Sequence, residues 1–185
     1  MAGAYATWMP GKVRRIVTAN RDDGRSYIES DTLLPQATVA PDEPVRVGLW
    51  LTDRAPASTT APDPVPDGVI LRTPPAHRGG SVIRIVDFQP DRLRGHLSAA
   101  DLVQRGATVT PDRSARHPGF HQTDTVDYAV CLEGEIWAML DEGETLMRPG
   151  DVLIQRGTFH AWSNRSDRVC RMLFILIDAE PAFAH

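Results

Sequence analysis

Short runs of β-branched and apolar residues recur along the chain, separated by glycine, proline and aspartate. Runs bounded in this way by turn-forming residues are typical of β-strands. Helical periodicity is limited to residues 98–105, where Ser98 is in the position of an N-cap and Gly106 follows the last turn. The predicted strands are Val13–Thr18, Val45–Thr52, Gly68–Arg72, Ser81–Phe88, Val126–Leu132, Glu135–Leu140, Asp151–Gln155 and Arg168–Ile177.

The last of these predicted strands is apolar on both faces. In the sequence RMLFILID, which covers residues 171–178, the even positions from 172 to 176 and the odd positions from 173 to 177 are all apolar. A strand with one face in water alternates apolar with polar residues, so both faces of this strand must be covered. Because the strands follow one another closely without helices between them, the sequence predicts an all-β fold, either an antiparallel barrel or a sandwich.

Composition narrows the class of protein. The chain has 185 residues, a formal net charge of −4, 42% hydrophobic residues and 24% charged residues. This is ordinary globular composition, and the small negative charge gives no electrostatic signature of nucleic-acid binding. No apolar run approaches the roughly 20 residues that span a bilayer, and no targeting segment is evident. Two cysteines, Cys131 and Cys170, are too few for a disulfide framework. We therefore expect a cytoplasmic protein with reduced thiols and neither a nucleic-acid nor a membrane partner.

Two of the six histidines occur beside the densest strands, together with a carboxylate. His121 and Asp127 share parity and would project to one face of an extended segment, whereas His160 follows a turn and begins a strand-like segment. If these strands pair within one barrel, His121, Asp127 and His160 can converge. Two imidazoles and one carboxylate suit Fe(II), Mn(II), Ni(II) or Zn(II), with coordination positions left open for substrate. The alternative from spacing alone is a set of hydrogen-bonded histidines at strand ends.

Residues 119–164 resemble the two conserved motifs of the cupin superfamily. The second motif is similar to GDVLIQRGTFH at 150–160, with an asparagine at position 164. The first motif is similar to HQT at 121–123, followed by Asp127 and then YAVCLEGE at 128–135. The resemblance implies a cupin-type antiparallel β-barrel, a jelly roll, with a site inside its mouth.

The motif alignment assigns a metal-ligand set and also shows where this chain departs from it. Counting back from Gly134 places His121 at the first histidine of the cupin set, Thr123 at the second and Asp127 at the glutamate, whereas His160 aligns with the third histidine. A threonine hydroxyl is a poor ligand for these metals but can hydrogen-bond a water molecule or substrate. Two outcomes stay open: a divalent metal held by His121, Asp127 and His160, or a metal-free barrel.

Four further residues are candidates for roles around this site. Trp162 shares parity with His160 and is expected to line the pocket, although it could equally be a core residue. Cys131 shares parity with Asp127 and is expected lower in the barrel as a small apolar side chain. Thr123 and the loop residue His117 are candidate proton-transfer groups, with an exposed loop histidine as the alternative for His117.

The resemblance covers the last 100 residues more strongly than the first 80. We expect one structural domain, in which residues 1–80 add strands and loops to a barrel formed by residues 81–185. The segment Asp53–Asp67, which holds four prolines, is predicted to be a surface loop. Strands that are apolar on both faces, together with the family resemblance, predict a homodimer.

The expected function is that of a small cupin enzyme. Its substrate would be a small carbonyl, hydroxy or carboxylate compound, and a divalent metal would polarise a substrate oxygen. Lyase, isomerase or dehydratase chemistry is preferred over dioxygenase chemistry, because Lewis-acid catalysis tolerates varied ligand sets and Thr123 or His117 could move protons. The alternative is a non-catalytic, metal-free cupin that binds or senses a small molecule.

Overall fold

The computed structural model describes residues 12–34, 44–65, 72–95, 97–104 and 116–181. Most of the predicted strand Gly68–Arg72 lies outside these residues. The elements, in chain order, are β1 (Val13–Asn20), β2 (Ser26–Leu34), β3 (Val45–Thr52), β4 (Ser81–Phe88), the 3-10 helix η1 (Asp91–Leu93), α1 (Ala99–Gln104), β5 (Thr125–Glu133), β6 (Ile136–Leu140), β7 (Glu144–Met147), β8 (Val152–Arg156), β9 (His160–Ser163) and β10 (Cys170–Asp178).

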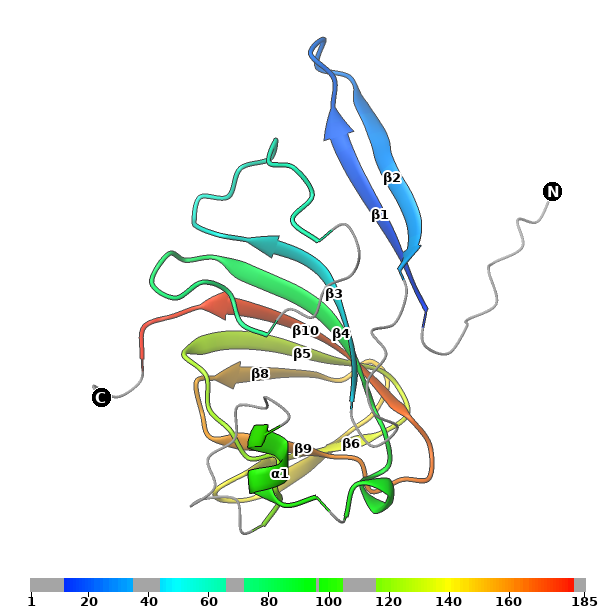
Figure 1. Ribbon diagram of the computed structural model, residues 1–185, viewed down its shortest axis with the longest axis vertical. Coiled ribbons are helices and arrows are strands. Elements are labelled where there is room, and N and C mark those ends of the chain that lie inside the picture. Colours follow the sequence, from blue (N-terminus) through cyan, green and yellow to red (C-terminus); the bar gives the residue numbers. More distant parts are fainter. Residues whose placement is uncertain (1–11, 35–43, 66–71, 96, 105–115, 182–185) are drawn as a thin grey trace, which may run out of the picture.

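Two antiparallel sheets form the body of the protein (Figure 1). The larger sheet has five strands in the order β3-β4-β10-β5-β8, and the smaller has three in the order β7-β6-β9. The two sheets pack against each other through a shared apolar core, which contains residues of both. The prediction of an all-β antiparallel barrel is therefore confirmed.

Strand β10 shows how the sequence pattern builds the two layers. Its even positions, Met172, Phe174 and Leu176, face the inner core between the sheets. Its odd position Leu173 packs on the opposite side, in a second apolar cluster with Val47. The inner face of β10 is thus covered by the second sheet, whereas Leu173, Ile175 and Ile177 on the outer face are half-buried.

The turn between β5 and β6 requires a glycine. Gly134 has a φ of 74°, a conformation that residues with a side chain rarely adopt. A Cβ atom at this position would lie 2.7 Å from the carbonyl oxygen of Val169 and 3.0 Å from the Cα of Cys170. The glycine of the first motif thus allows the β5–β6 turn to pack directly against the start of β10.

The N-terminal strands form a hairpin that projects from the large sheet (Figure 1). Val13 of β1 and Leu34 of β2 pack on Val47 of β3 and Ile85 of β4, on the outer face of that sheet. The sequence did not predict β2, because most of its side chains are exposed and polar and apolar residues do not alternate regularly along it. Strand β3 belongs to the large sheet itself, so residues before position 80 contribute to the barrel.

The predicted helix is confirmed over a shorter range. Ser98 caps α1: its Oγ accepts a hydrogen bond from the backbone N–H of Asp101 at 3.2 Å, and Asp101 Oδ2 accepts one from the backbone N–H of Ser98 at 2.8 Å. This reciprocal pair is a capping box. Among the described residues, no helix has both the length and the apolar character that a membrane span needs.

Candidate functional site

The backbone brings His121 and His160 side by side. His160 is the first residue of β9, and His121 forms an isolated antiparallel bridge to it, with both N–H···O=C distances at 2.9 Å. The two imidazole ring centroids are 4.4 Å apart. Two histidines separated by 39 positions therefore form a pair, as the motif alignment predicts.

Each imidazole is oriented by a backbone carbonyl two residues earlier in the chain. Nδ1 of His121 lies 2.9 Å from the carbonyl oxygen of Gly119, and Nδ1 of His160 lies 2.9 Å from that of Thr158. A carbonyl oxygen can only accept, so each Nδ1 carries the proton. In the neutral ring the lone pair is then on Nε2, which is the arrangement found in metal-binding histidines.

Both histidines are held in the neutral form. Burial lowers the pKa of His121 below its ordinary value, against an opposing effect of its hydrogen bond to Gly119. Burial, followed by the neighbouring His121, lowers the pKa of His160 to about 3. At neutral pH the pair therefore offers two uncharged nitrogen donors.

Asp127 lies on the inner face of β5 with a carboxylate oxygen that has no partner. The residue is 5% exposed, and its Oδ1 is buried with no hydrogen-bond partner among the described residues. Burial raises the pKa of Asp127, although a hydrogen bond from Thr125 and the charge of Arg84 oppose this. A buried acceptor without a partner costs about 1–3 kcal/mol, which makes Asp127 a candidate functional group.

Two arginines lie on the same inner face, and sequence reasoning missed them. Arg84 of β4 pairs in register with Gly48 of β3 and Phe174 of β10, and its guanidinium lies 5.9 Å from the Phe174 ring centroid. Burial and then the charge of Arg46 lower the pKa of Arg84 to about 10. Arg84 shares parity with the apolar residues Val82 and Val86, and this signal could have identified it.

Three other predicted residues lie where the parity of the strands suggested. Trp162 is buried and packs edge-on against His160, with ring centroids 5.7 Å apart. Cys131 is fully buried in the apolar core, and burial raises its pKa. Thr123 is partly buried, and its Oγ1 is 2.9 Å from that of Thr125, the residue that hydrogen-bonds to Asp127. The catalytic and pocket roles of these residues stay predictions.

His117 is half-buried and in contact with Asp91, so it is not the exposed loop histidine of the alternative prediction. Its Nε2 lies 3.5 Å from Asp91 Oδ2, and its Nδ1 accepts a hydrogen bond from the backbone N–H of Gly119 at 3.1 Å. Asp91 in turn accepts a hydrogen bond from Ser163 Oγ at 2.6 Å. His117 is thus bound into a polar network beyond the end of β9, and a proton-transfer role for it stays a prediction.

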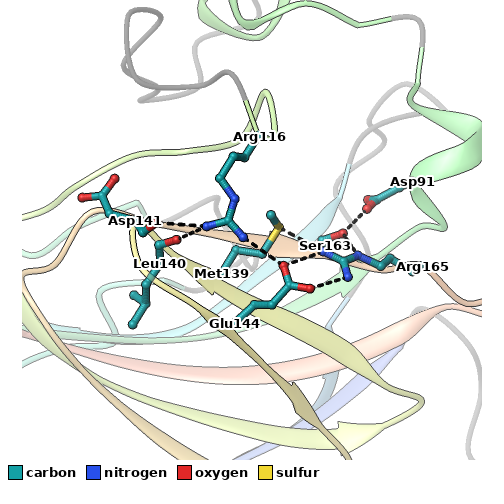
Figure 2. A network of polar contacts seen from close by, with 8 residues as sticks. All are labelled: Asp91, Arg116, Met139, Leu140, Asp141, Glu144, Ser163 and Arg165. Carbon is teal, nitrogen blue, oxygen red and sulfur yellow. Dashed lines mark hydrogen bonds and ion pairs between the residues drawn. The ribbon is translucent and has the colours of Figure 1, made fainter.

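That network continues from Ser163 through Arg165 to Glu144 (Figure 2). Arg165 Nη1 and Nη2 donate to the two carboxylate oxygens of Glu144 at 2.7 and 2.8 Å. Arg116 Nη2 donates to the same carboxylate at 3.2 Å, and its Nη1 donates to the carbonyl oxygen of Leu140 at 2.6 Å. Leu140 of β6 pairs in register with His160 of β9. Arg116 therefore connects the segment that precedes His121 to the end of β6, directly beside His160.

The Nε2 atoms of His121 and His160 are suitable ligands for a divalent metal ion. Two neutral imidazoles with their Nε2 atoms available are suitable ligands for Fe(II), Mn(II), Ni(II) or Zn(II). In the part of the chain that the structure describes, however, no three histidine, cysteine, aspartate or glutamate side chains gather closely enough to bind one ion. The structure therefore places His121 and His160 next to each other, and Asp127 does not form a three-residue ligand cluster with them.

Comparison with known proteins identifies several fungal relatives. The chain is 37% identical over 136 residues to phomopsin biosynthesis cluster protein C' of Diaporthe leptostromiformis, covering 68% of this chain and 59% of the relative. It is 30% identical over 182 residues to oryzines biosynthesis cluster protein J of Aspergillus oryzae, covering 94% and 87%. It is 26% identical over 180 residues to the cupin-domain-containing oxidoreductase fogC of Aspergillus ruber, covering 94% and 76%.

No protein-family model matches the sequence. The chain spans 59% of the length of the two phomopsin cluster proteins that it matches. The similarity to two relatives named cupin-domain-containing oxidoreductases extends over 94% and 91% of the chain, and the two-sheet barrel and the paired motif histidines agree with it. This chain belongs to the cupin superfamily.

Proposed function

We propose that this protein is a cupin enzyme that binds a divalent metal ion through the Nε2 atoms of His121 and His160. The observation that carries this proposal is the orientation of both imidazoles, whose Nδ1 atoms donate to backbone carbonyls and leave the two Nε2 atoms as acceptors. The substrate would be a small carbonyl, hydroxy or carboxylate compound. When bound, the metal would polarise a substrate oxygen.

The protein's own residues supply a route for protons. Asp127 is buried with a raised pKa, which brings a carboxyl group closer to the range useful for general acid–base catalysis at neutral pH. The hydroxyls of Thr125 and Thr123 connect Asp127 to a partly buried position, so a proton can pass along this short chain. Trp162 would exclude water beside His160. These features favour a lyase, isomerase or dehydratase reaction, in which protons move and no oxidant is needed.

The names of the relatives favour a second candidate reaction. Four of them are named cupin-domain-containing oxidoreductases. Oxidation of the same class of substrate, with the metal held by the same two histidines, is therefore the second enzymatic candidate. The oxidised product and the consumption of oxygen distinguish it from the first.

A non-catalytic, metal-free cupin is the alternative from a different class of function. Thr123 is at the position of a ligand histidine, and Asp127 is not grouped with the two histidines that remain. Such a protein would bind or sense a small molecule between the sheets without transforming it. It would keep the imidazole pair as hydrogen-bond acceptors for that ligand.

Metal content tests the proposal directly. We expect protein purified from metal-replete growth to contain close to one divalent ion per chain, and His121→Ala and His160→Ala each to lose it. His77→Asn is the matched control, because His77 is exposed, lies outside both motifs and has a positive φ that asparagine tolerates, and this variant should retain the metal. Wild-type protein without metal, or variants that retain it, would contradict the metal-dependent function and favour the metal-free alternative.

Two further expectations concern the state of the protein in the cell. The predicted homodimer is supported by exposed apolar side chains on the outer face of β5 and β8, including Tyr128, Val152 and Ile154, which a second copy could cover. The proposed cytoplasmic location is supported by two buried, free cysteines. Sedimentation as a monomer at micromolar concentration would contradict the homodimer.

A further inference from the structure

We propose that Arg116 and Gln122 are positioning residues, which hold the segment of residues 116–122 in place so that His121 stays beside His160. This role rests on the proposed function, because its consequence is a higher affinity of the histidine pair for a divalent metal ion. It deepens that proposal by naming the side chains that set the separation of the two imidazoles. The observation behind it is that the chain holds the two histidines in different ways.

The backbone holds His160 more firmly than His121. His160 lies in β9, and all four residues of β9 pair in register with β6. His121 belongs to no strand of the described residues, and its backbone is held by the two hydrogen bonds of an isolated bridge to His160. A segment with few backbone hydrogen bonds opens at a lower free-energy cost than a strand within a sheet. The position of the His121 imidazole therefore depends on side-chain contacts made by its neighbours.

Arg116 makes the first of these contacts, at the start of the segment (Figure 2). Its Nη1 donates to the carbonyl oxygen of Leu140, the last residue of β6, at 2.6 Å, and its Nη2 donates to Glu144 Oε2 at 3.2 Å. The Glu144 carboxylate is itself held in place, because both Nη atoms of Arg165 donate to it at 2.7 and 2.8 Å. A planar guanidinium that donates to two acceptors has a more restricted orientation than a single contact would give. Arg116 therefore connects the start of the segment to the strand that pairs with β9.

Gln122 makes the second contact, directly after His121. Its Nε2 donates to the carbonyl oxygen of Gly157 at 2.7 Å. Gly157 lies in the turn between β8 and β9, and its N–H donates to the carbonyl oxygen of Thr125, the first residue of β5, at 3.0 Å. Gln122 therefore connects the end of the segment to the turn that leads into His160.

An aromatic contact lies between these two polar contacts. Phe120 is 1% exposed, and its ring stacks on that of Phe159 with centroids 5.1 Å apart. Each phenylalanine directly precedes one of the paired histidines, and both belong to an apolar cluster on the outer face of the small sheet. Apolar contacts are non-directional, whereas hydrogen bonds weaken steeply as their angle departs from linearity. The stacked rings therefore keep the segment against the sheet, and Arg116 and Gln122 set its position along β9.

The position of the segment matters because two ligands must reach one ion. Two imidazoles bind the same metal ion only if both Nε2 atoms come within about 2.1 Å of it. A small shift of His121 away from His160, whose ring centroid is 4.4 Å from its own, therefore lowers metal affinity without unfolding the protein. Removal of groups that orient metal ligands typically lowers affinity about 10–100-fold. Arg116 and Gln122 act through the backbone, so we expect the lower end of this range.

Cobalt(II) binding and amide hydrogen exchange test this role in parallel. Co(II) is titrated into metal-stripped protein, and its visible absorption reports both affinity and coordination geometry. We expect Arg116→Met and Gln122→Met each to weaken Co(II) binding about tenfold and to change the absorption spectrum. In the metal-free protein, the His121 amide proton should exchange about tenfold faster in both variants. Arg116→Lys should restore part of the affinity, because an ammonium group can still donate to the carbonyl oxygen of Leu140.

The matched control is Arg14→Met. Arg14 is also exposed and also donates to a carboxylate through two nitrogen atoms, to Asp31 at 2.7 and 2.6 Å, but it lies on β1. This variant should leave Co(II) affinity, the spectrum and His121 exchange unchanged. Unchanged affinity and exchange in both Arg116→Met and Gln122→Met would overturn the positioning role. Faster exchange throughout β6 and β9, with no larger effect at His121, would show a general loss of stability and would also overturn it. Faster exchange at His121 in the variants, with no Co(II) bound by the wild type, would contradict the proposed metal site and leave the positioning of the segment standing.

Discussion

The two ends of the barrel are built by the same strands yet have opposite chemistry. At the floor, Cys131 of β5, Cys170 and Met172 of β10 and Ile136 of β6 are fully buried in a purely apolar contact network. Toward the mouth, β5 continues to Asp127, and β9 begins with His160 beside His121. The floor is packed with apolar side chains, whereas Asp127 Oδ1 at the mouth is buried without a hydrogen-bond partner in the part of the chain that the structure describes.

This difference separates the residues that stabilise the fold from those that carry function. Apolar burial contributes roughly 25 cal/mol for each Å² removed from water, so the floor residues provide the driving force for folding. Buried polar groups at the mouth contribute little to stability or reduce it, and such groups are often retained because they act on a ligand. Substitutions at the two ends should therefore have opposite effects on stability and on binding.

The largest effect is expected at the floor. Met172→Ala removes a fully buried side chain and leaves a cavity, so we expect a loss of about 2–5 kcal/mol in the free energy of unfolding. Denaturant unfolding measures this loss. Leu132→Ala is the control, because Leu132 is 43% exposed on the same sheet and should change stability by no more than about 0.5 kcal/mol. The folded fraction of Met172→Ala should still bind metal, and loss of metal from folded protein would contradict the separation of the two ends.

The fold and part of the site could be predicted from the sequence because their signals are local. Runs of apolar and β-branched residues identified β5 and β10, and Gly134 of the first motif lies in the turn between β5 and β6, where its φ is positive. The pairing of His121 with His160 followed from the motif alignment. The parity of Arg84 with Val82 and Val86 was a local signal that the prediction overlooked, whereas its approach to Arg46 depends on the register of the bulged β3–β4 pair, which no local pattern encodes.

The contacts of His117 also could not be predicted from the sequence. The sequence offered it as a proton-transfer group or an exposed loop residue, whereas in the structure it is half-buried with its Nε2 3.5 Å from Asp91 Oδ2. Asp91 lies 26 positions away in the chain, at the start of η1, and its carboxylate also accepts from Ser163. Three segments that are distant in sequence define this contact, so proximity along the chain could not predict it.

A smaller effect on stability is expected at the mouth. Asp127→Asn keeps the shape of the side chain and removes a buried carboxyl group whose Oδ1 has no partner, so we expect the free energy of unfolding to stay within about 1 kcal/mol of the wild type. Activity toward a small carboxylate should fall sharply, because an amide cannot transfer the proton. Denaturant unfolding and turnover are measured on the same preparation. If Asp127→Asn lowers the free energy of unfolding by more than about 2 kcal/mol, the carboxylate stabilises the fold, and the mouth then contributes to stability as the floor does.

The smallest effect is expected in the network outside the mouth (Figure 2). Hydrogen bonds from Arg165 lower the pKa of Glu144, so its contribution to stability is present above the pKa of the unfolded chain, about 4.3, and is lost as the pH falls through the lower pKa of the folded protein. The melting temperature of Glu144→Gln should therefore lie below that of the wild type at pH 7, and the two should converge toward pH 3.

The control for this pH dependence is Glu135→Gln. The distance from Glu135 Oε2 to Arg148 Nε is 4.0 Å, which is longer than the distances between Glu144 and Arg165. This control should give a smaller difference from the wild type at pH 7 than Glu144→Gln does. Because Arg116 links Glu144 to the carbonyl of Leu140 beside His160, Glu144→Gln should also weaken metal binding slightly at neutral pH. A difference in melting temperature between Glu144→Gln and the wild type that stays unchanged down to pH 3 would contradict an ionic contribution of Glu144 to stability. The position of the histidine pair would then depend on the strands that carry it and not on Glu144.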